Sequence, residues 1–232
     1  MKTLLIDGLL AVLYPPLCPC CGEVMTRGEG PMCLACRLKL PLTGMEESPR
    51  ENEMIDKLQG LVPIESAVAY FRYLRDSPQA ALIHDMKYRG RPAIGRQLAA
   101  EYARVLQSKG FFSNIDAIAP VPLNFWHHCR RGFNQSAWIA RGIADVAHLP
   151  IIDALRARRH GSQTRLGAEQ RRRAVGSVYS ARADALRGVG HLLLVDDICT
   201  TGSTLYSCAA AIHGANPSTR ISVFTLATTG LI

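Results

Sequence analysis

The sequence has no long hydrophobic run and no internal repeat. No stretch reaches the roughly 18 apolar residues that a helix needs to cross a bilayer. The apolar start of the chain is interrupted by Asp7 and lacks a small-residue cleavage site, so we predict a short amphipathic helix ending at Tyr14-Pro15-Pro16 rather than a signal peptide. These absences predict a cytoplasmic protein without a membrane span.

Acidic residues are too few to balance the basic ones. The chain has 19 Asp and Glu residues against 27 Lys and Arg residues, which gives a net charge of +8. Such an excess attracts phosphorylated ligands, nucleic acid or an anionic membrane surface. With 48% hydrophobic and 20% charged residues, the composition is otherwise that of an ordinary globular protein. Its 232 residues are enough to bury a sizeable core.

The composition changes near position 44. A polar, acidic stretch at 44–60 predicts a linker with a short helix, which separates an N-terminal helix and cysteine-rich module at 1–43 from a domain at 61–232. That domain alternates apolar strands with helical patterns, which predicts an α/β fold with a mostly parallel sheet flanked by helices. We predict strands at 66–73, 115–121, 151–152, 191–195 and 220–227, and helices at 79–87, 94–108, 134–147 and 203–213.

Five of the eight cysteines lie between positions 18 and 36. Cys18-Pro19-Cys20-Cys21-Gly22 forms a tight turn, and Cys33-Leu34-Ala35-Cys36 supplies a second pair of thiols. Two pairs at this spacing predict a tetrahedral, structural zinc site whose ligands are Cys18, Cys21, Cys33 and Cys36. Cys20 is then spare, or exchanges with a neighbouring ligand. A group of free or redox-active thiols is the alternative.

The most informative stretch is a predicted buried strand that runs into two acids, Asp196 and Asp197. In α/β sheets, ligands bind at the carboxyl ends of strands, and a turn that opens a helix presents N–H groups to anions. The acids suit the 2′- and 3′-hydroxyls of a ribose, and the turn suits its 5′-phosphate. The turn residues are Thr200, Thr201, Gly202, Ser203 and Thr204. An acid-ended strand before a capped helix is the alternative.

Two common nucleotide-binding motifs are missing. No Gly-Lys-Ser/Thr follows the turn, and G-x-G-x-x-G is absent, which argues against a P-loop and a dinucleotide fold. The stretch closely resembles the motif with which type I phosphoribosyltransferases bind 5-phosphoribosyl-1-pyrophosphate (PRPP). By that resemblance, Asp196 and Asp197 contact ribose and the turn wraps the 5′-phosphate. The resemblance also implies Mg²⁺, held mostly by ligand oxygens and water.

A second predicted strand ends in Pro120-Val121-Pro122-Leu123. Because proline has no N–H, Val121 and Leu123 supply the amide donors of this loop, and the rigid prolines can direct them toward a pyrophosphate. Lys87 and Arg131 are candidate partners for the charge of that pyrophosphate. A solvated surface role is the alternative for Lys87, and a proline-capped strand with a solvated basic turn is the alternative for the loop.

A basic segment lies between positions 156 and 173, where seven arginines face a single acid, Glu169. Phe125, Trp126 and Phe133 flank a second basic stretch at 127–131. Cations beside aromatic rings suit single-stranded nucleic acid. The candidates for this role are Arg156, Arg158, Arg159, Arg171, Arg172 and Arg173. A mobile hood whose arginines meet only PRPP, or a solvated face, is the alternative.

Five stretches, taken in order, resemble the ComF family (ComFC/GntX-like), bacterial proteins associated with DNA uptake in natural transformation. They are the cysteine module, the I-H-D-M-K-Y-R-G stretch that contains Lys87, the P-V-P-L loop with its R-R-G-F-N-Q turn, Gln163-Thr164-Arg165-Leu166 with Arg171, and V-D-D-I-C-T-T-G. This resemblance implies a type I phosphoribosyltransferase fold with a small N-terminal zinc module of four cysteines. Ala174-Val175 departs from the Asn-Val common in the family, and Tyr179 replaces a common Phe.

Three functional hypotheses follow. In the first, an enzyme lets a nucleophile displace pyrophosphate at C1 of PRPP, although the sequence names no general base. In the second, the protein keeps the PRPP site and handles incoming single-stranded DNA beside a helicase-like partner. In the third, PRPP is a regulatory signal without turnover. We predict a PRPP-binding protein of ComF type that acts in DNA uptake; a metabolic phosphoribosyltransferase with a small-molecule acceptor and no role with DNA is the alternative.

Overall fold

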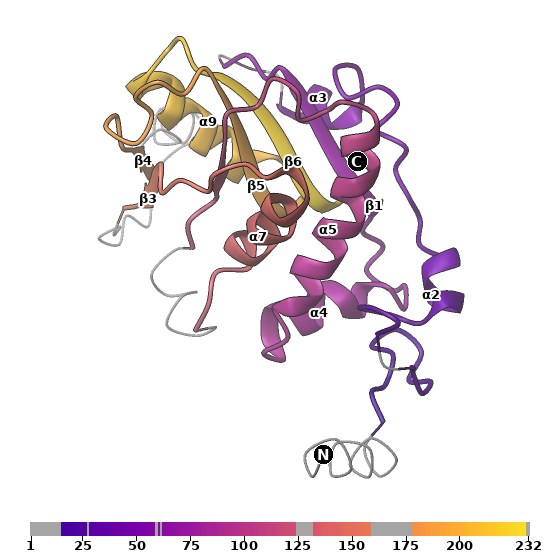
Figure 1. Cartoon of the computed structure of the whole chain (residues 1–232). Helices are drawn as coiled ribbons and strands as arrows, with labels where there is room; N and C mark the ends of the chain where they lie inside the picture. The colour runs from indigo at the N-terminus through magenta and orange to yellow at the C-terminus, as the bar shows by residue number, and fades with distance from the viewer. Residues whose placement is uncertain are drawn as a thin grey trace, which may run out of the picture.

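A four-stranded parallel sheet forms the centre of the protein (Figure 1). The computed structural model describes residues 15–26, 28–58, 60, 62–123, 132–158 and 178–230. The strands are β1 (Ser66–Arg72), β2 (Ala117–Pro120), β5 (His191–Cys199) and β6 (Arg220–Thr228), in the order β1-β6-β5-β2. Since all their pairings are parallel, their carboxyl ends lie at one edge of the sheet.

The strands form where the sequence has continuous apolar runs. Residues 192–195 of β5 and 221–228 of β6 are buried, as expected for strands that helices cover on both faces. In the register of these two strands, Asp196 faces Thr225 and Cys199 faces Thr228. The central pair therefore brings the acids of β5 close to the end of β6.

The described chain has four longer helices: α4 (Ala80–Tyr88), α5 (Ala93–Ser108), α7 (Gln135–Ala147) and α9 (Ser203–Ala215). Of these, α5, α7 and α9 pack on the strands, and α4 packs on α5. Figure 1 shows α5 and α7 in front of the sheet and α9 behind it. The packing of α5 on α7 requires a glycine, because a Cβ at Gly142 would lie 2.1 Å from the carbonyl oxygen of Arg96. The predicted class, a mostly parallel sheet flanked by helices, is confirmed.

Four shorter elements complete the described chain: α2 (Leu34–Leu38), α3 (Glu53–Leu58), β3 (Leu155–Ala157) and β4 (Tyr179–Ala181). The strands β3 and β4 form a separate antiparallel pair that packs on α9. Arg156, the first arginine of the predicted basic segment, lies on β3. The strand predicted at 151–152 is a single bridge between Ile151 and Ile118.

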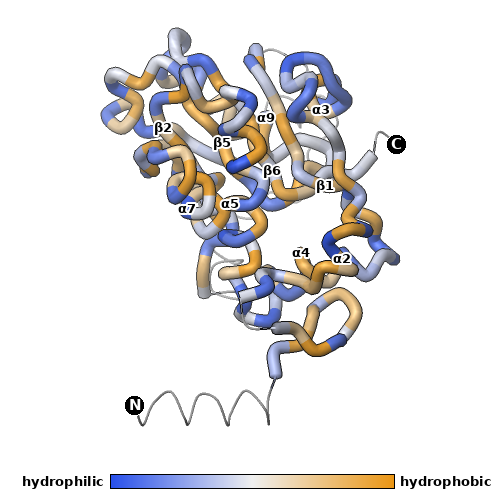
Figure 2. Tube along the Cα trace, turned by 45° about the vertical axis from the view of Figure 1, so that its right-hand side comes forward, coloured by the Kyte–Doolittle hydropathy of each residue, from blue (hydrophilic) through white to orange (hydrophobic). Residues whose placement is uncertain are grey.

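The buried apolar side chains form one continuous core. It includes Met32 beside the cysteines, Met54 of α3, Tyr102 of α5 and Phe224 of β6. Figure 2 shows the hydrophobic stretches of the sheet and the hydrophilic loop beside α3. Within the described ranges, no helix combines the length and apolar character that a membrane crossing requires. The domain boundaries at 43/44 and 60/61 stay a prediction.

Candidate functional site

The predicted ligand residues that the structure describes gather at the carboxyl edge of the sheet. There β2 ends at Pro120, β5 at Cys199 and β6 at Thr228. The strand predicted to end at Val195 continues to Cys199, because β6 pairs with it along its whole length. Asp196 and the rest of that stretch therefore have a fixed backbone.

Asp196 is held by two hydrogen bonds to the same carboxylate oxygen, Oδ1. Ser136 donates its hydroxyl over 2.9 Å, and the N–H of Asp197 donates over 2.9 Å. Burial and the neighbouring charge of Asp197 raise the pKa of Asp196 to about 7, while both hydrogen bonds act in the opposite direction. Near neutral pH this carboxyl is therefore close to its titration midpoint.

Asp197 binds the ammonium group of Lys87, whose Nζ lies 2.9 Å from its Oδ2. The side chain of Asp197 is 10% exposed and that of Lys87 is 16% exposed, so the pair is largely shielded from water. The surface role considered for Lys87 is therefore wrong for this structure. Both acids keep further lone pairs, with which carboxylates accept hydrogen bonds from vicinal hydroxyls.

The turn after β5 opens α9 and lines a small depression. Gly202 has φ +76°, a backbone conformation that L side chains rarely adopt, and a Cβ there would lie 3.0 Å from Leu58. The depression has a volume of about 20 Å³, close to that of one water molecule, so a phosphate would sit at its mouth. Its walls are Asp196, Ile198, Cys199, Thr200, Gly202, Ser203, Thr204 and Leu205. Thr201 donates its hydroxyl to Ser203 over 3.2 Å.

The expectation for the Val121 amide needs correction. Its N–H donates to the carbonyl of Val195 over 2.9 Å, which extends the pairing of β2 with β5 by one residue. This N–H is therefore not available to a pyrophosphate. Leu123 stands at the end of a described range and stays a candidate, whereas Arg131 lies outside the described residues.

Two residues of the N-terminus of α7 were missed by sequence reasoning. Asn134 caps the helix by accepting the N–H of Ser136 over 3.0 Å, and it donates its amide to the carbonyl of Val121 over 3.0 Å. Ser136 then reaches Asp196. An asparagine before a helical pattern is a known cap signal, so Asn134 was detectable. The partner of Ser136 lies 60 positions away, and no local pattern reveals it.

The nucleic-acid candidates are only partly described. Arg156 lies on β3 and Arg158 directly follows it; both side chains are exposed. The N–H of Arg158 donates to the carbonyl of Val178 over 2.9 Å, which continues the β3–β4 pairing. The other four candidates, Arg159, Arg171, Arg172 and Arg173, lie outside the described residues, as do Phe125 and Trp126.

The four predicted metal ligands come together in the N-terminal module. The sulfur atoms of Cys18, Cys21, Cys33 and Cys36 all lie within 4.8 Å of one another, so this cluster can hold a metal ion. Burial would raise the pKa of Cys18, but backbone N–H groups, among them that of Cys33, bond its sulfur and lower the pKa to about 6. A thiol of low pKa suits a metal ligand. Burial raises the pKa of the half-buried Cys20 to about 12.

The fold and the site together define a class of protein. The structure has a parallel sheet with acids near the carboxyl end of a central strand, a hydroxyl-rich turn before a helix, and an N-terminal cluster of four cysteines. Together these features are those of a type I phosphoribosyltransferase fold with a small cysteine module, as predicted. Among solved structures, a glutamine PRPP amidotransferase from B. subtilis, complexed with ADP and GMP, has a TM-score of 0.38 and 18% identity. The match covers 58% of this chain and 26% of that one, so it spans about a quarter of the enzyme.

Curated proteins similar to this chain have names linked to DNA utilization and competence. DNA utilization protein YhgH of Escherichia coli O157:H7 is 28% identical over 208 residues, which cover 84% of this chain and 89% of that protein. Competence protein F of Haemophilus influenzae is 30% identical over 134 residues, or 55% of this chain and 58% of its own. Competence protein ComFC of Bacillus subtilis is 24% identical over 140 residues, or 60% and 55%. No protein-family model matches the chain. These similarities support the prediction of a ComF-family protein.

Proposed function

We propose that this chain binds PRPP, or a related ribose 5-phosphate ligand, at the carboxyl edge of its sheet. One observation carries the proposal: Asp196 and Asp197 stand beside a hydroxyl-rich turn that opens a 13-residue helix, all on one strand end. An acid pair beside an anion-binding turn suits the diol and the 5′-phosphate of one ribose. Helix N-termini favour bound phosphate.

Metal ions enter this proposal in two ways. Zinc in the four-cysteine cluster would be structural, since four thiolates complete a tetrahedral site and a small module gains stability from it. Mg²⁺ would reach the site with PRPP and neutralise charge on its pyrophosphate. Because Asp196 is bonded to Ser136 and Asp197 to Lys87, the ligand's own oxygens and water would hold this ion.

The cellular role follows from the relatives and from charge. Relatives are named for DNA utilization and for competence, which supports a role in DNA uptake. A net charge of +8 and the exposed Arg156 and Arg158 support contact with incoming single-stranded DNA. We place this step in the cytoplasm; a helicase-like partner stays a prediction.

Thermal stabilisation tests the assignment of the ligand site. PRPP with Mg²⁺ should raise the melting temperature of the wild type, and the double variant Asp196→Ala, Asp197→Ala should lose this shift. Asp76→Ala, which removes an exposed acid from a turn, is the matched control and should keep it. An unchanged shift in the double variant contradicts the ligand assignment.

Oligonucleotide binding tests the role with DNA. Single-stranded DNA should bind with an affinity that falls steeply with salt, because arginines displace counterions from phosphates. The double variant Arg156→Gln, Arg158→Gln should bind single-stranded DNA more weakly than the wild type. PRPP turnover with a small-molecule acceptor and no DNA binding would instead favour a metabolic transferase.

A further inference from the structure

The sugar-phosphate turn is supported by a part of the chain that sequence patterns assign to a linker. The helix α3 precedes the sheet, yet its last residues touch the turn. The backbone oxygen of Lys57 and the side chain of Leu58 lie 3.3 Å and 3.0 Å from the position of a Cβ on Gly202. This contact places α3 directly against the middle of the turn.

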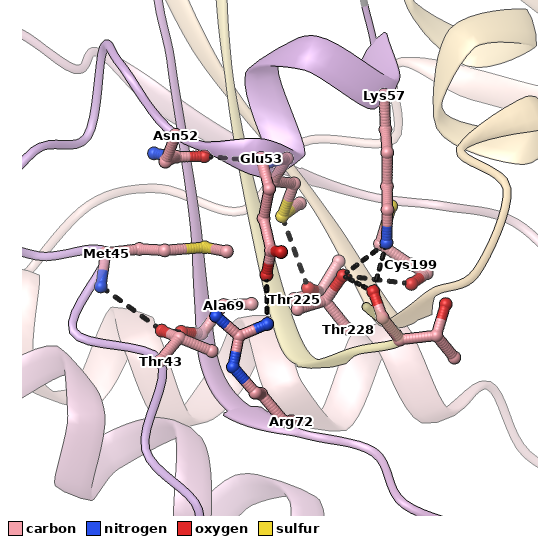
Figure 3. Close-up of polar contacts among 12 residues, drawn as sticks. Thr43, Met45, Asn52, Glu53, Lys57, Ala69, Arg72, Cys199, Thr225 and Thr228 are labelled. Carbon is pink, nitrogen blue, oxygen red and sulfur yellow. Dashed lines mark hydrogen bonds and ion pairs between the residues drawn. The ribbon is translucent and has the colours of Figure 1, made fainter. Parts of the chain in front are cut away.

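Two polar contacts with β1 and two buried side chains fix α3 in place. Asn52 caps the helix by accepting the N–H groups of Met54 and Ile55, and it donates its amide to the carbonyl of Ala67 over 2.9 Å. Glu53 forms an ion pair with Arg72 of β1, as Figure 3 shows. Met54 is fully buried and Leu58 is nearly so. The helix thus presents its remaining long side chain, that of Lys57, from a fixed backbone.

The ammonium group of Lys57 binds the end of β6 (Figure 3). It donates to the hydroxyl of Thr228 over 3.2 Å and to the carbonyl of Thr229. Since an ammonium group only donates, the Thr228 hydroxyl must accept from it and turn its own hydrogen elsewhere. That hydrogen has two carbonyl oxygens within reach, that of Cys199 at 3.2 Å and that of Thr229 at 3.1 Å. Because Lys57 already donates to the carbonyl of Thr229, the carbonyl of Cys199 is the acceptor through which Lys57 reaches the residue at which the turn begins.

Thr229 extends this arrangement by one residue. Its N–H donates to the carbonyl of Cys199 over 3.1 Å, and its hydroxyl donates to the carbonyl of Thr200 over 3.3 Å. In a trans peptide, the N–H points opposite to the C=O of the same unit. Because both carbonyls face β6, the N–H groups of Thr200 and Thr201 are directed away from β6.

We propose that Lys57 is a positioning residue of the phosphate turn: through Thr228 and Thr229 it holds two carbonyls toward β6 and so directs the turn's amides toward the 5′-phosphate. Its own two partners are neutral groups, so its positive charge stays available to the bound anion. This inference rests on the proposed sugar-phosphate site and adds to it a residue of the segment predicted as a linker.

Calorimetric titration with ribose 5-phosphate tests the proposal, with pyrophosphate as the second probe. Lys57→Met should lower the affinity for ribose 5-phosphate by about tenfold, the typical effect of losing one charge-assisted hydrogen bond. Lys57→Arg, which keeps the charge and the donors, should restore most of the affinity. Pyrophosphate should bind all variants alike. Lys39→Met removes an exposed lysine of the cysteine module and should bind like the wild type.

The outcomes separate this proposal from the proposed function. If the wild type binds neither ribose 5-phosphate nor PRPP, the sugar-phosphate site itself fails. If the wild type binds and Lys57→Met binds equally well, only the role of Lys57 is overturned, even where that variant melts earlier. Should Lys57→Met not fold, Thr228→Val decides, because it removes the hydroxyl through which Lys57 reaches Cys199 and keeps the size of the side chain. Weaker ribose 5-phosphate binding supports the proposal, and unchanged binding overturns it.

Discussion

The ammonium nitrogen of Lys87 lies 2.9 Å from Oδ2 of Asp197, and this ion pair joins α4 to the acid-tipped strand β5. Both side chains are more than four-fifths buried. A buried ion pair adds little net stability compared with apolar residues, but the loss of one partner leaves a buried charge without compensation. The pair therefore makes α4 and the carboxyl edge of the sheet interdependent.

Replacing Lys87 with Met should destabilise the protein by about 3 kcal/mol at neutral pH, since Asp197 would keep its burial and lose its cation. Urea denaturation measures this change. The exposed Lys39 gives the control, and Lys39→Met should alter the free energy of unfolding by less than about 0.5 kcal/mol. If Lys87→Met is as stable as the wild type, water and not Lys87 stabilises the charge of Asp197.

The titration of Asp196 should make stability fall as pH rises. Its pKa is raised from an ordinary 3.8 to about 7, so between these values the folded protein binds more protons than the unfolded chain. Stability should thus decrease across this window, with a slope approaching roughly 1 kcal/mol per pH unit for a single group. Asp196→Asn should flatten the decrease and make the protein more stable than the wild type above pH 7.

Urea denaturation at several pH values from about 4 to about 8 checks this sign. Asp76→Asn, at an exposed turn position, should follow the wild-type curve. Parallel curves for the wild type and Asp196→Asn would mean that Asp196 keeps an ordinary pKa in the folded protein.

The zinc content of cysteine variants should distinguish the four clustered thiols from the thiol of Cys20, the fifth cysteine of the N-terminal module. Cys36→Ser removes one of the four predicted ligands, so the purified protein should lose most of its zinc and melt earlier. Cys20→Ser changes a neighbouring thiol that is outside the cluster of four and should keep one zinc per chain. Mass spectrometry under native conditions distinguishes the two. Loss of zinc from Cys20→Ser would identify Cys20 as a ligand.

The sequence revealed those features whose signal is local. Apolar runs located β5 and β6, the spacing of two cysteine pairs selected the four clustered thiols, and the order of acids and hydroxyls located the turn that opens α9 beside Asp196. In each case the residues that act together are neighbours in the chain. Short-range geometry therefore carries the prediction.

The missed features depend on contacts between distant positions. Lys57 and Thr228 are 171 positions apart, and Ser136 and Asp196 are 60 apart. The amide of Val121 was misassigned for the same reason, because only the pairing with Val195 shows that it is already bonded. The strands β3 and β4 have three residues each and gain their shape from each other and from α9, which no local pattern records.

Ser136 supplies the last prediction, because its hydroxyl is the side-chain donor that bonds Asp196. Ser136→Ala should raise the pKa of Asp196 further, since the hydrogen bond lowers it. Because ribose 5-phosphate binds the ionised acid in this proposal, its binding should then shift to higher pH, and its affinity at pH 7 should fall about threefold to tenfold.

Ser136→Thr keeps the hydroxyl and should restore the wild-type pH profile of binding. Ser108→Ala, an exposed serine at the end of α5, is the control. If the affinity of Ser136→Ala equals that of the wild type at every pH, Ser136 serves only in packing. If the affinity falls by the same factor at every pH, Ser136 contacts the ligand and does not act through the ionisation of Asp196.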